Sequence, residues 1–193
     1  MSNTESKTCQ NCFYADGGTC GNCSAQPEGA TTEISAGFVC DNWKHQLAKV
    51  IFLDVDGVIN SRRTCIAYDG YPWEVDKQGL KMFDHVAIDL IRVACEKTGA
   101  RIILSSTWRR STGHVNMAVA MHLPMMDSTP EKLSSARGEE IAMWLRDHPE
   151  VEQYAIVDDD SDMLDGQLPY FVKVDPDNGL SYKNYLKILE LLK

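Results

Sequence analysis

Short apolar runs alternate with amphipathic segments along the chain from residue 49 onward. The run 49–53 (KVIFL) has the continuous apolar character of a buried strand. Apolar residues between 83 and 94 recur at helical spacing, and Gly99 is a suitable residue to end that helix. Further strands are predicted at 102–104, 123–126, 154–157 and 170–174, and further helices around 115–122, 141–145 and 185–192. This alternation predicts an α/β fold, a Rossmann-like parallel sheet covered by helices on both faces.

The N-terminal region has a different pattern, with few apolar residues and many cysteines. Paired Cys-x2-Cys steps suit tetrahedral zinc, and a segment this short needs a metal or other crosslink to fold. We therefore expect a polar tail at 1–8, a Cys-rich zinc module at 9–44 and the α/β domain at 49–193. Four of five thiols would bind the zinc, while an iron–sulfur cluster, free thiols, a disulfide and His45 as a ligand remain alternatives. The five are Cys9, Cys12, Cys20, Cys23 and Cys40.

Charge and composition narrow the functional classes. The chain has 193 residues, with 28 acidic and 19 basic side chains and a formal charge of −9. This balance argues against nucleic-acid binding through a broad basic surface, although it leaves a local patch open. No apolar stretch approaches the roughly 20 residues of a membrane span, and the N-terminus lacks the apolar core of a secretory signal. We expect a soluble, cytoplasmic protein without a membrane partner.

Polar residues follow three of the predicted strands, at the point where each strand ends. Asp54 and Asp56 follow the first strand, Ser105 and Ser106 the second, and the acidic run 158–160 the strand at 154–157. Ligands of open parallel sheets bind at the carboxyl ends of the strands, so these side chains should meet at one edge. Carboxylates gathered there repel one another unless a cation lies between them. The pattern predicts a Mg²⁺ site, because Mg²⁺ prefers oxygen ligands and accompanies phosphate substrates.

Four segments of this domain resemble the motifs of the haloacid dehalogenase (HAD) superfamily of phosphohydrolases. LDVDGV at 53–58 resembles the first motif, IILSSTWR at 102–109 the second, ARGEEIAMWL at 136–145 the third, and AIVDDDSD at 155–162 the fourth. They occur in the family's order. The stretches LSSTWR, RGEEI, DDDSDM and NGL at 178–180 are most similar to the HAD domain of Swiss-army-knife RNA-repair proteins.

The resemblance implies a two-step phosphatase mechanism built on carboxylates. Asp54 would attack phosphorus and form an aspartyl-phosphate, and Asp56 would act as general acid and then general base. Mg²⁺ would be held by Asp54, by the backbone carbonyl of Asp56, and by an aspartate of the fourth motif. For that aspartate Asp158 is the first choice, followed by Asp159 and then Asp162.

The resemblance also implies roles for polar residues of the second and third motifs. Ser105 would donate a hydrogen bond to a phosphoryl oxygen, with Ser106 as its nearest competitor. Arg137 would neutralise the transition state, but the superfamily more often has Lys there, so Lys132 competes for this role. Arg109 would bind substrate phosphate, or else it is a surface or ion-paired arginine.

Substrate access follows from the lengths of the connecting segments. The superfamily's caps are inserted after the first motif or between the second and third. The first gap holds only a long loop at 55–78 and one helix, and the second, 110–136, is short, so we expect a minimal cap and an open site. Such a site suits a nucleic-acid end or a phosphoprotein, and leaves a nucleotide or small metabolite phosphate open. Tyr68, Tyr71 and Trp73 lie in the first segment, which could cover the site, whereas Trp108 is expected to serve mainly in packing.

The sequence therefore predicts an enzyme, a Mg²⁺-dependent HAD-type phosphomonoesterase. The alternative is a catalytically inactive HAD fold that serves as a binding or adaptor module, with the Cys-rich segment contacting a protein partner. The presence of both Asp54 and Asp56 argues against that alternative. Arg62, Arg63, Arg109 and Arg110 are candidates for a basic groove near the site, but the sequence does not show whether they form one.

Overall fold

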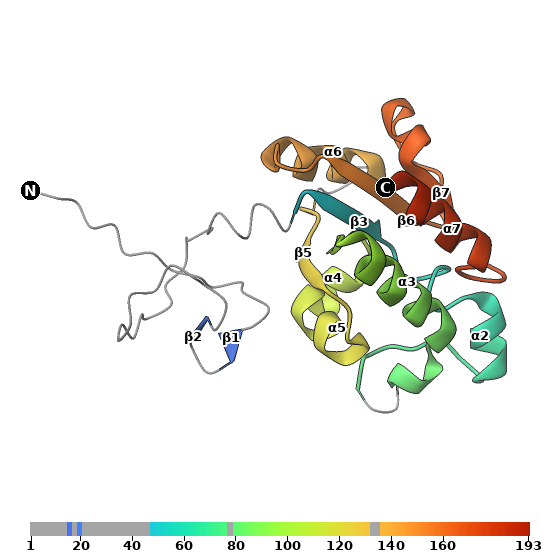
Figure 1. The fold of residues 1–193 in the computed structure, drawn as a ribbon. Coiled ribbons are helices and arrows are strands. Elements are labelled where there is room, and N and C mark those ends of the chain that lie inside the picture. The colour runs from blue at the N-terminus through green and yellow to red at the C-terminus, as the bar shows by residue number, and fades with distance from the viewer. Residues whose placement is uncertain (1–14, 17–18, 21–46, 77–78, 132–135) are drawn as a thin grey trace, which may run out of the picture.

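The structure is a computed structural model, and it describes residues 15–16, 19–20, 47–76, 79–131 and 136–193. Its centre is a five-stranded sheet with the strand order β5-β4-β3-β6-β7, in which every neighbouring pair is parallel (Figure 1). The strands are β3 (Lys49–Leu53), β4 (Arg101–Leu104), β5 (Met125–Ser128), β6 (Gln153–Asp158) and β7 (Phe171–Lys173).

Helices cover both faces of this sheet, as the apolar strands require. Alternate residues of a strand point to opposite faces, so Ile51 and Leu53 belong to one buried cluster and Val50 and Phe52 to another. The first cluster includes residues of α3 (His85–Thr98), α5 (Gly113–Met121) and α7 (Tyr182–Leu191), and the second includes residues of α6 (Arg137–Asp147). The predicted three-layer α/β architecture is confirmed.

The ends of α3 show why the sequence pattern located this helix well. Asp84 is the N-cap, and its carboxylate accepts hydrogen bonds from the backbone N–H groups of Val86 and Ala87 at 3.0 and 3.1 Å. Gly99 ends the helix in the left-handed conformation, with φ of 74°. The predicted helix end is confirmed.

The structure differs from the prediction in two short segments. The strand expected at 123–126 starts at Met125, because the left-handed residue His122 and Pro124 still belong to the connection. The segment expected as a long loop contains α2 (Arg62–Ala67), capped by Ser61, and is followed by η1 (Gly79–Met82). Helix α2 spans fewer than two turns, which is too short to show a periodic apolar pattern.

Two further short elements belong to the α/β domain, α4 (Trp108–Ser111) and η2 (Asp165–Tyr170). Nearer the N-terminus, β1 (Ala15–Asp16) and β2 (Thr19–Cys20) form a separate antiparallel pair. Cys9, Cys12, Cys23, Cys40 and His45 lie outside the described residues, as does the side chain of Cys20. The zinc module and the domain boundaries stay predictions. None of the helices in the described ranges is long and apolar enough to cross a membrane.

Candidate active site

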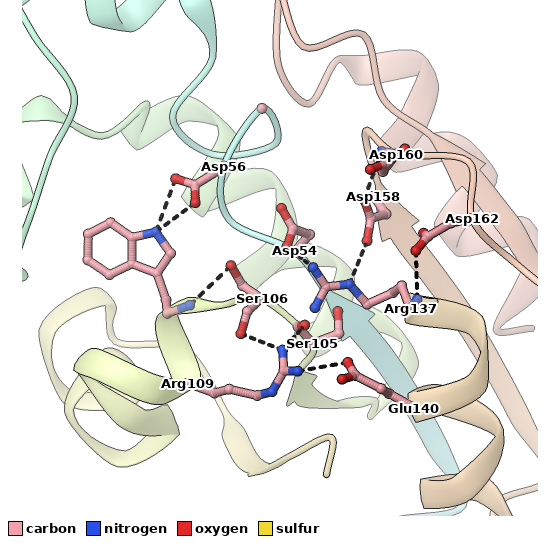
Figure 2. A network of polar contacts seen from close by, with 12 residues as sticks. Asp54, Asp56, Ser105, Ser106, Arg109, Arg137, Glu140, Asp158, Asp160 and Asp162 are labelled. Atoms are coloured by element: carbon pink, nitrogen blue, oxygen red, sulfur yellow. Dashed lines mark hydrogen bonds and ion pairs between the residues drawn. The ribbon is translucent and has the colours of Figure 1, made fainter. Parts of the chain in front are cut away.

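The central strands deliver the predicted site residues to one edge of the sheet. Strand β3 lies between β4 and β6, so the residues that follow these strands are neighbours. The backbone N–H of Asp54 donates to the carbonyl of Val157, and that of Ser105 donates to the carbonyl of Leu53, both at 3.0 Å. These bonds continue the sheet beyond the strand ends and fix the start of each polar loop. Figure 2 shows the resulting group of acidic and basic side chains.

A cavity of about 350 Å³ opens at this edge. Its lining comes from the loops after β3 and β6, from the starts of α2 and α6, and from three further loops. It includes Asp54, Asp56, Gly57, Asn60, Arg62, Tyr71, Thr107, Arg137, Asp158, Asp159, Asp160 and Pro176. The cavity therefore combines five carboxylates of the first and fourth motifs with the guanidinium of the third.

Three of these carboxylates form a group that fits a metal ion. One oxygen from each of Asp54, Asp158 and Asp159 lies within 4.8 Å of the others. Asp54 and Asp158 are 5% and 1% exposed, and Asp158 Oδ2 accepts no hydrogen bond from the described residues. An all-oxygen set of buried carboxylates is the donor chemistry of a hard divalent cation such as Mg²⁺. The predicted ligands Asp158 and Asp159 thus both stand beside Asp54.

The electrostatics of this group support the same interpretation. Burial, followed by the charge of Asp158, raises the pKa of Asp54 to about 8, although the Arg137 guanidinium opposes the shift. Burial also raises the pKa of Asp158 to about 6. Without a cation the cluster therefore favours retained protons, and a bound divalent ion would compete with those protons for the same oxygens.

Gly57 allows the Asp159 carboxylate to approach the turn after β3. It adopts φ of +75°, and a Cβ at this position would lie 2.4 Å from Cγ of Asp159. A side chain would meet both a strained backbone conformation and a direct collision. Glycine is therefore required where the first motif contacts the fourth.

Arg137 is held between the carboxylates by the start of α6. Its backbone N–H donates to Asp162 Oδ2 at 2.7 Å, and its Nη2 donates to Asp54 Oδ1 at 3.3 Å. Its Nε lies 3.4 Å from Asp158 Oδ2. Asp162, the third choice as a metal ligand, is exposed and caps this helix instead. The competing Lys132 lies outside the described residues.

Asp56 stands apart from the three clustered carboxylates and has its own partners. It is exposed, and the indole Nε1 of Trp108 lies 3.0 and 3.1 Å from its two carboxylate oxygens. Asn60 Nδ2 also donates to Asp56 Oδ1, at 2.6 Å. Trp108 packs edge-on against Phe83 as expected, but its hydrogen bond to Asp56 was not foreseen. No local signal reveals it, because these residues are 52 positions apart.

The two serines of the second motif are both fully buried. Ser105 Oγ makes no hydrogen bond with the described residues, whereas Ser106 Oγ accepts a long one from the backbone N–H of Trp108 at 3.5 Å. An unbonded buried hydroxyl costs free energy, so a ligand oxygen within its reach would gain from it. Ser105 thus has the unbonded hydroxyl of the two, but neither serine is among the residues that line the cavity.

Arg109 has a structural role rather than a place in the cavity. Its Nη2 donates to Glu140 Oε2 at 2.7 Å, and these side chains are only 4% and 5% exposed. Its Nη1 donates to the carbonyls of Ser105 and Ser106 at 2.5 and 2.9 Å. Of the two roles that the sequence left open, Arg109 therefore has that of an ion-paired arginine, and we do not assign it to substrate binding. Glu140 was missed, although an acidic residue in the first turn of α6 is a weak signal.

Ion pairing also affects the arginines that were candidates for a basic groove. Arg62 pairs with Asp177 at 2.9 Å, Arg63 with Asp84 at 2.7 Å, and Arg110 with Glu131 at 3.2 Å. Their charges are thus largely offset within the chain. Arg62 alone of these three lines the cavity.

The aromatic residues of the segment after β3 are exposed, and Tyr71 reaches the site. Tyr68, Tyr71 and Trp73 are 48%, 57% and 67% exposed, and Tyr71 lines the cavity. This segment therefore covers the cavity only in part, with the ring of Tyr71 and the start of α2. No cap domain stands between the cavity and solvent in the part of the chain that the structure describes.

Comparison with known proteins agrees with this geometry. A family model described as "HAD domain in Swiss Army Knife RNA repair proteins" matches residues 50–185, which contain all four motifs. Neither the curated proteins nor the solved structures give a match. The chain therefore belongs to the family of HAD domains found in Swiss Army Knife RNA repair proteins.

Proposed function

We propose that this protein is a Mg²⁺-dependent phosphomonoesterase that acts through an aspartyl-phosphate on Asp54. The observation that carries the proposal is the position of this carboxylate. It lines an open cavity, beside one guanidinium and two further carboxylates that fit a divalent cation. In a surface loop of acidic residues, nothing would require a buried carboxylate such as Asp54 with the Arg137 guanidinium 3.3 Å from it.

In the first step, Asp54 attacks the phosphorus of the monoester and the bond to the leaving oxygen breaks. Asp56 donates a proton to that oxygen, so an alcohol leaves instead of an alkoxide. Arg137 lies between Asp54 and Asp158 and stabilises the negative charge on the transferring phosphoryl group. Asp54, Asp158 and Asp159 would hold Mg²⁺, which when bound neutralises charge on the nucleophile and the phosphate.

In the second step, water attacks the aspartyl-phosphate and releases inorganic phosphate. Asp56, which lost its proton to the alcohol, takes a proton from this water and returns to its starting state. Asp54 is regenerated as a carboxylate. Ser105, with its unbonded hydroxyl, supplies a hydrogen bond to a phosphoryl oxygen.

We propose a nucleotide or a phosphorylated nucleic-acid end as the substrate. The family description concerns RNA-repair proteins, and the cavity carries an exposed tyrosine and an arginine at its border. An aromatic face and a guanidinium suit a base and a second phosphate of the same strand. The test replaces Arg62 with Ala and compares it with Arg110→Ala, an exposed and ion-paired arginine outside the cavity lining.

We expect Arg62→Ala to raise KM for a phosphorylated oligonucleotide about 3- to 10-fold, the value of one partly screened contact, and to leave p-nitrophenyl phosphate unaffected. Arg110→Ala should change neither. Equal effects of both variants on both substrates would contradict the assignment of Arg62 to substrate binding.

Phosphate release from a substrate panel tests the activity itself. The panel contains p-nitrophenyl phosphate, nucleoside monophosphates, and oligonucleotides phosphorylated at the 5′ or 3′ end, each with Mg²⁺ or with EDTA. Release should require Mg²⁺ and disappear in Asp54→Asn, whereas Asp165→Asn, an exposed aspartate outside the cavity lining, should retain it. Folded wild type that releases no phosphate from any substrate would favour a catalytically inactive binding module.

A further inference from the structure

The exposed carboxylate of Asp56 is held by an indole from a distant part of the chain. Trp108 is the first residue of α4, after β4, and its Nε1 points at both carboxylate oxygens of Asp56, at 3.0 and 3.1 Å. Figure 2 shows this indole with its two dashed lines ending on Asp56. The contact joins the loop that follows β3 to the loop that follows β4.

A second donor, Asn60, contacts the same carboxylate with a defined orientation. Its Nδ2 donates to Asp56 Oδ1 at 2.6 Å, and its own Oδ1 accepts the backbone N–H of Gly57 at 3.0 Å. Because the amide oxygen is occupied by Gly57, the NH₂ group must face Asp56. Neither this NH₂ group nor an indole N–H accepts a proton. These two partners therefore orient the Asp56 carboxylate without exchanging protons with it.

The donors are rigid whereas the carboxylate is accessible. Asn60 is fully buried and Trp108 is 7% exposed, with its ring packed edge-on against the fully buried Phe83 at 5.5 Å. Asp56 itself is exposed and lines the cavity. An exposed aspartate without partners would sample several rotamers, and a proton donor works best when one geometry is held by packed neighbours.

We infer that Trp108 is a positioning residue that aims Asp56 at the leaving-group oxygen, with Asn60 as its second support. This inference deepens the proposed function and rests on it. It predicts that loss of the indole N–H weakens protonation of the leaving group while the attack by Asp54 continues. The effect therefore depends on which leaving group the substrate carries.

The test compares kcat/KM of Trp108→Phe on two phosphate monoesters. p-Nitrophenolate leaves without a proton, whereas the alkoxide of a nucleoside 5′-monophosphate requires one. Because kcat/KM reports only the steps up to and including the first irreversible one, it does not include the later role of Asp56 with water. We expect a loss on the order of 10- to 100-fold for the nucleotide and under about threefold for p-nitrophenyl phosphate. Asp56→Asn should show the same split with a larger loss on the nucleotide.

Trp144→Phe is the matched control. Trp144 is 3% exposed, and its indole also donates to an aspartate, Asp127 Oδ2, at 2.8 Å, but neither residue lines the cavity. This variant should lose thermal stability without a difference between the two substrates. Should Trp108→Phe fail to fold, site-specific benzothienylalanine at position 108 removes the N–H and keeps the two-ring shape.

The outcomes separate the inference from the proposed function. A loss confined to the nucleotide supports the positioning role. An active wild type whose Trp108 variant loses equally on both substrates, or on neither, overturns the inference and leaves the phosphatase intact. A folded wild type with no activity on either substrate overturns the proposed function and the inference with it.

Discussion

The buried ion pair between Arg109 and Glu140 gives a prediction whose size follows from the structure. Nη2 and Oε2 are 2.7 Å apart, and the side chains are 4% and 5% exposed, so solvent screens this pair little. Breaking a buried pair by removing one partner costs about 3–5 kcal/mol, because the remaining buried charge loses that partner's compensation. Arg109→Met also removes two hydrogen bonds to the carbonyls of Ser105 and Ser106.

Neighbouring Arg110 provides the control for this measurement. Its ion pair with Glu131 is 3.2 Å long, with side chains 52% and 49% exposed, and such exposed pairs contribute about 0–1 kcal/mol. At about 2–4 °C per kcal/mol for a domain of this size, Arg109→Met should lower Tm by roughly 6–20 °C. Arg110→Met should lower Tm by less than about 4 °C.

A double-mutant cycle completes the test. It compares the thermal unfolding of Arg109→Met, of Glu140→Met and of the double variant that carries both substitutions. Because the double variant removes both buried charges, it should recover a large part of the stability that Arg109→Met loses. Equal melting temperatures for Arg109→Met and Arg110→Met would refute the assignment of a buried structural pair. So would a double variant whose loss equals the sum of the single losses.

Two further predictions concern the carboxylate cluster. Because the pKa of Asp54 is raised from 3.8 to about 8, the native state binds more protons than the unfolded state in this interval, and stability should fall as pH rises from about 4 to 8. Melting in EDTA should show this slope in wild type and a flatter one in Asp54→Asn; a wild-type Tm that rises over the interval would contradict it. For the metal site, Gly57→Ala should lose the Tm increase that Mg²⁺ produces, since its Cβ displaces Asp159, which lies 2.4 Å away. Gly99→Ala has nearly the same φ, 74°, with no atom within 4 Å, and should keep the Mg²⁺ effect; equal behaviour of the two variants would place the metal elsewhere.

The sequence was sufficient for the architecture and for the residues that follow each strand. Continuous apolar strands and periodic helices are local patterns, and a parallel sheet brings its strand ends together wherever they lie in the chain. The positions of Asp54, Ser105 and Asp158 at one edge could therefore be predicted. The short helix α2 could not, because fewer than two turns show no period.

Contacts between side chains that are far apart in the sequence could not be predicted, for a different reason. The bond from Trp108 to Asp56 spans 52 positions, and the pair of Arg109 with Glu140 spans 31. Neither pair has a spacing that marks it, since only the packing of α4 and α6 against the sheet ends brings these groups together. Sequence alone therefore left Arg109 with two roles, and the burial of its guanidinium decides between them.

The covalent step on Asp54 is the central claim, and a quenched-flow experiment with ³²P-labelled substrate tests it most directly. Wild type mixed with substrate and Mg²⁺, then quenched in acid, should carry a label that hydroxylamine removes. Asp54→Asn should carry none. Asp56→Asn should accumulate more label on p-nitrophenyl phosphate, because the attack proceeds without a proton donor while the water step lacks its base. Phosphate release at the wild-type rate with no label on either the wild type or Asp56→Asn would contradict the account.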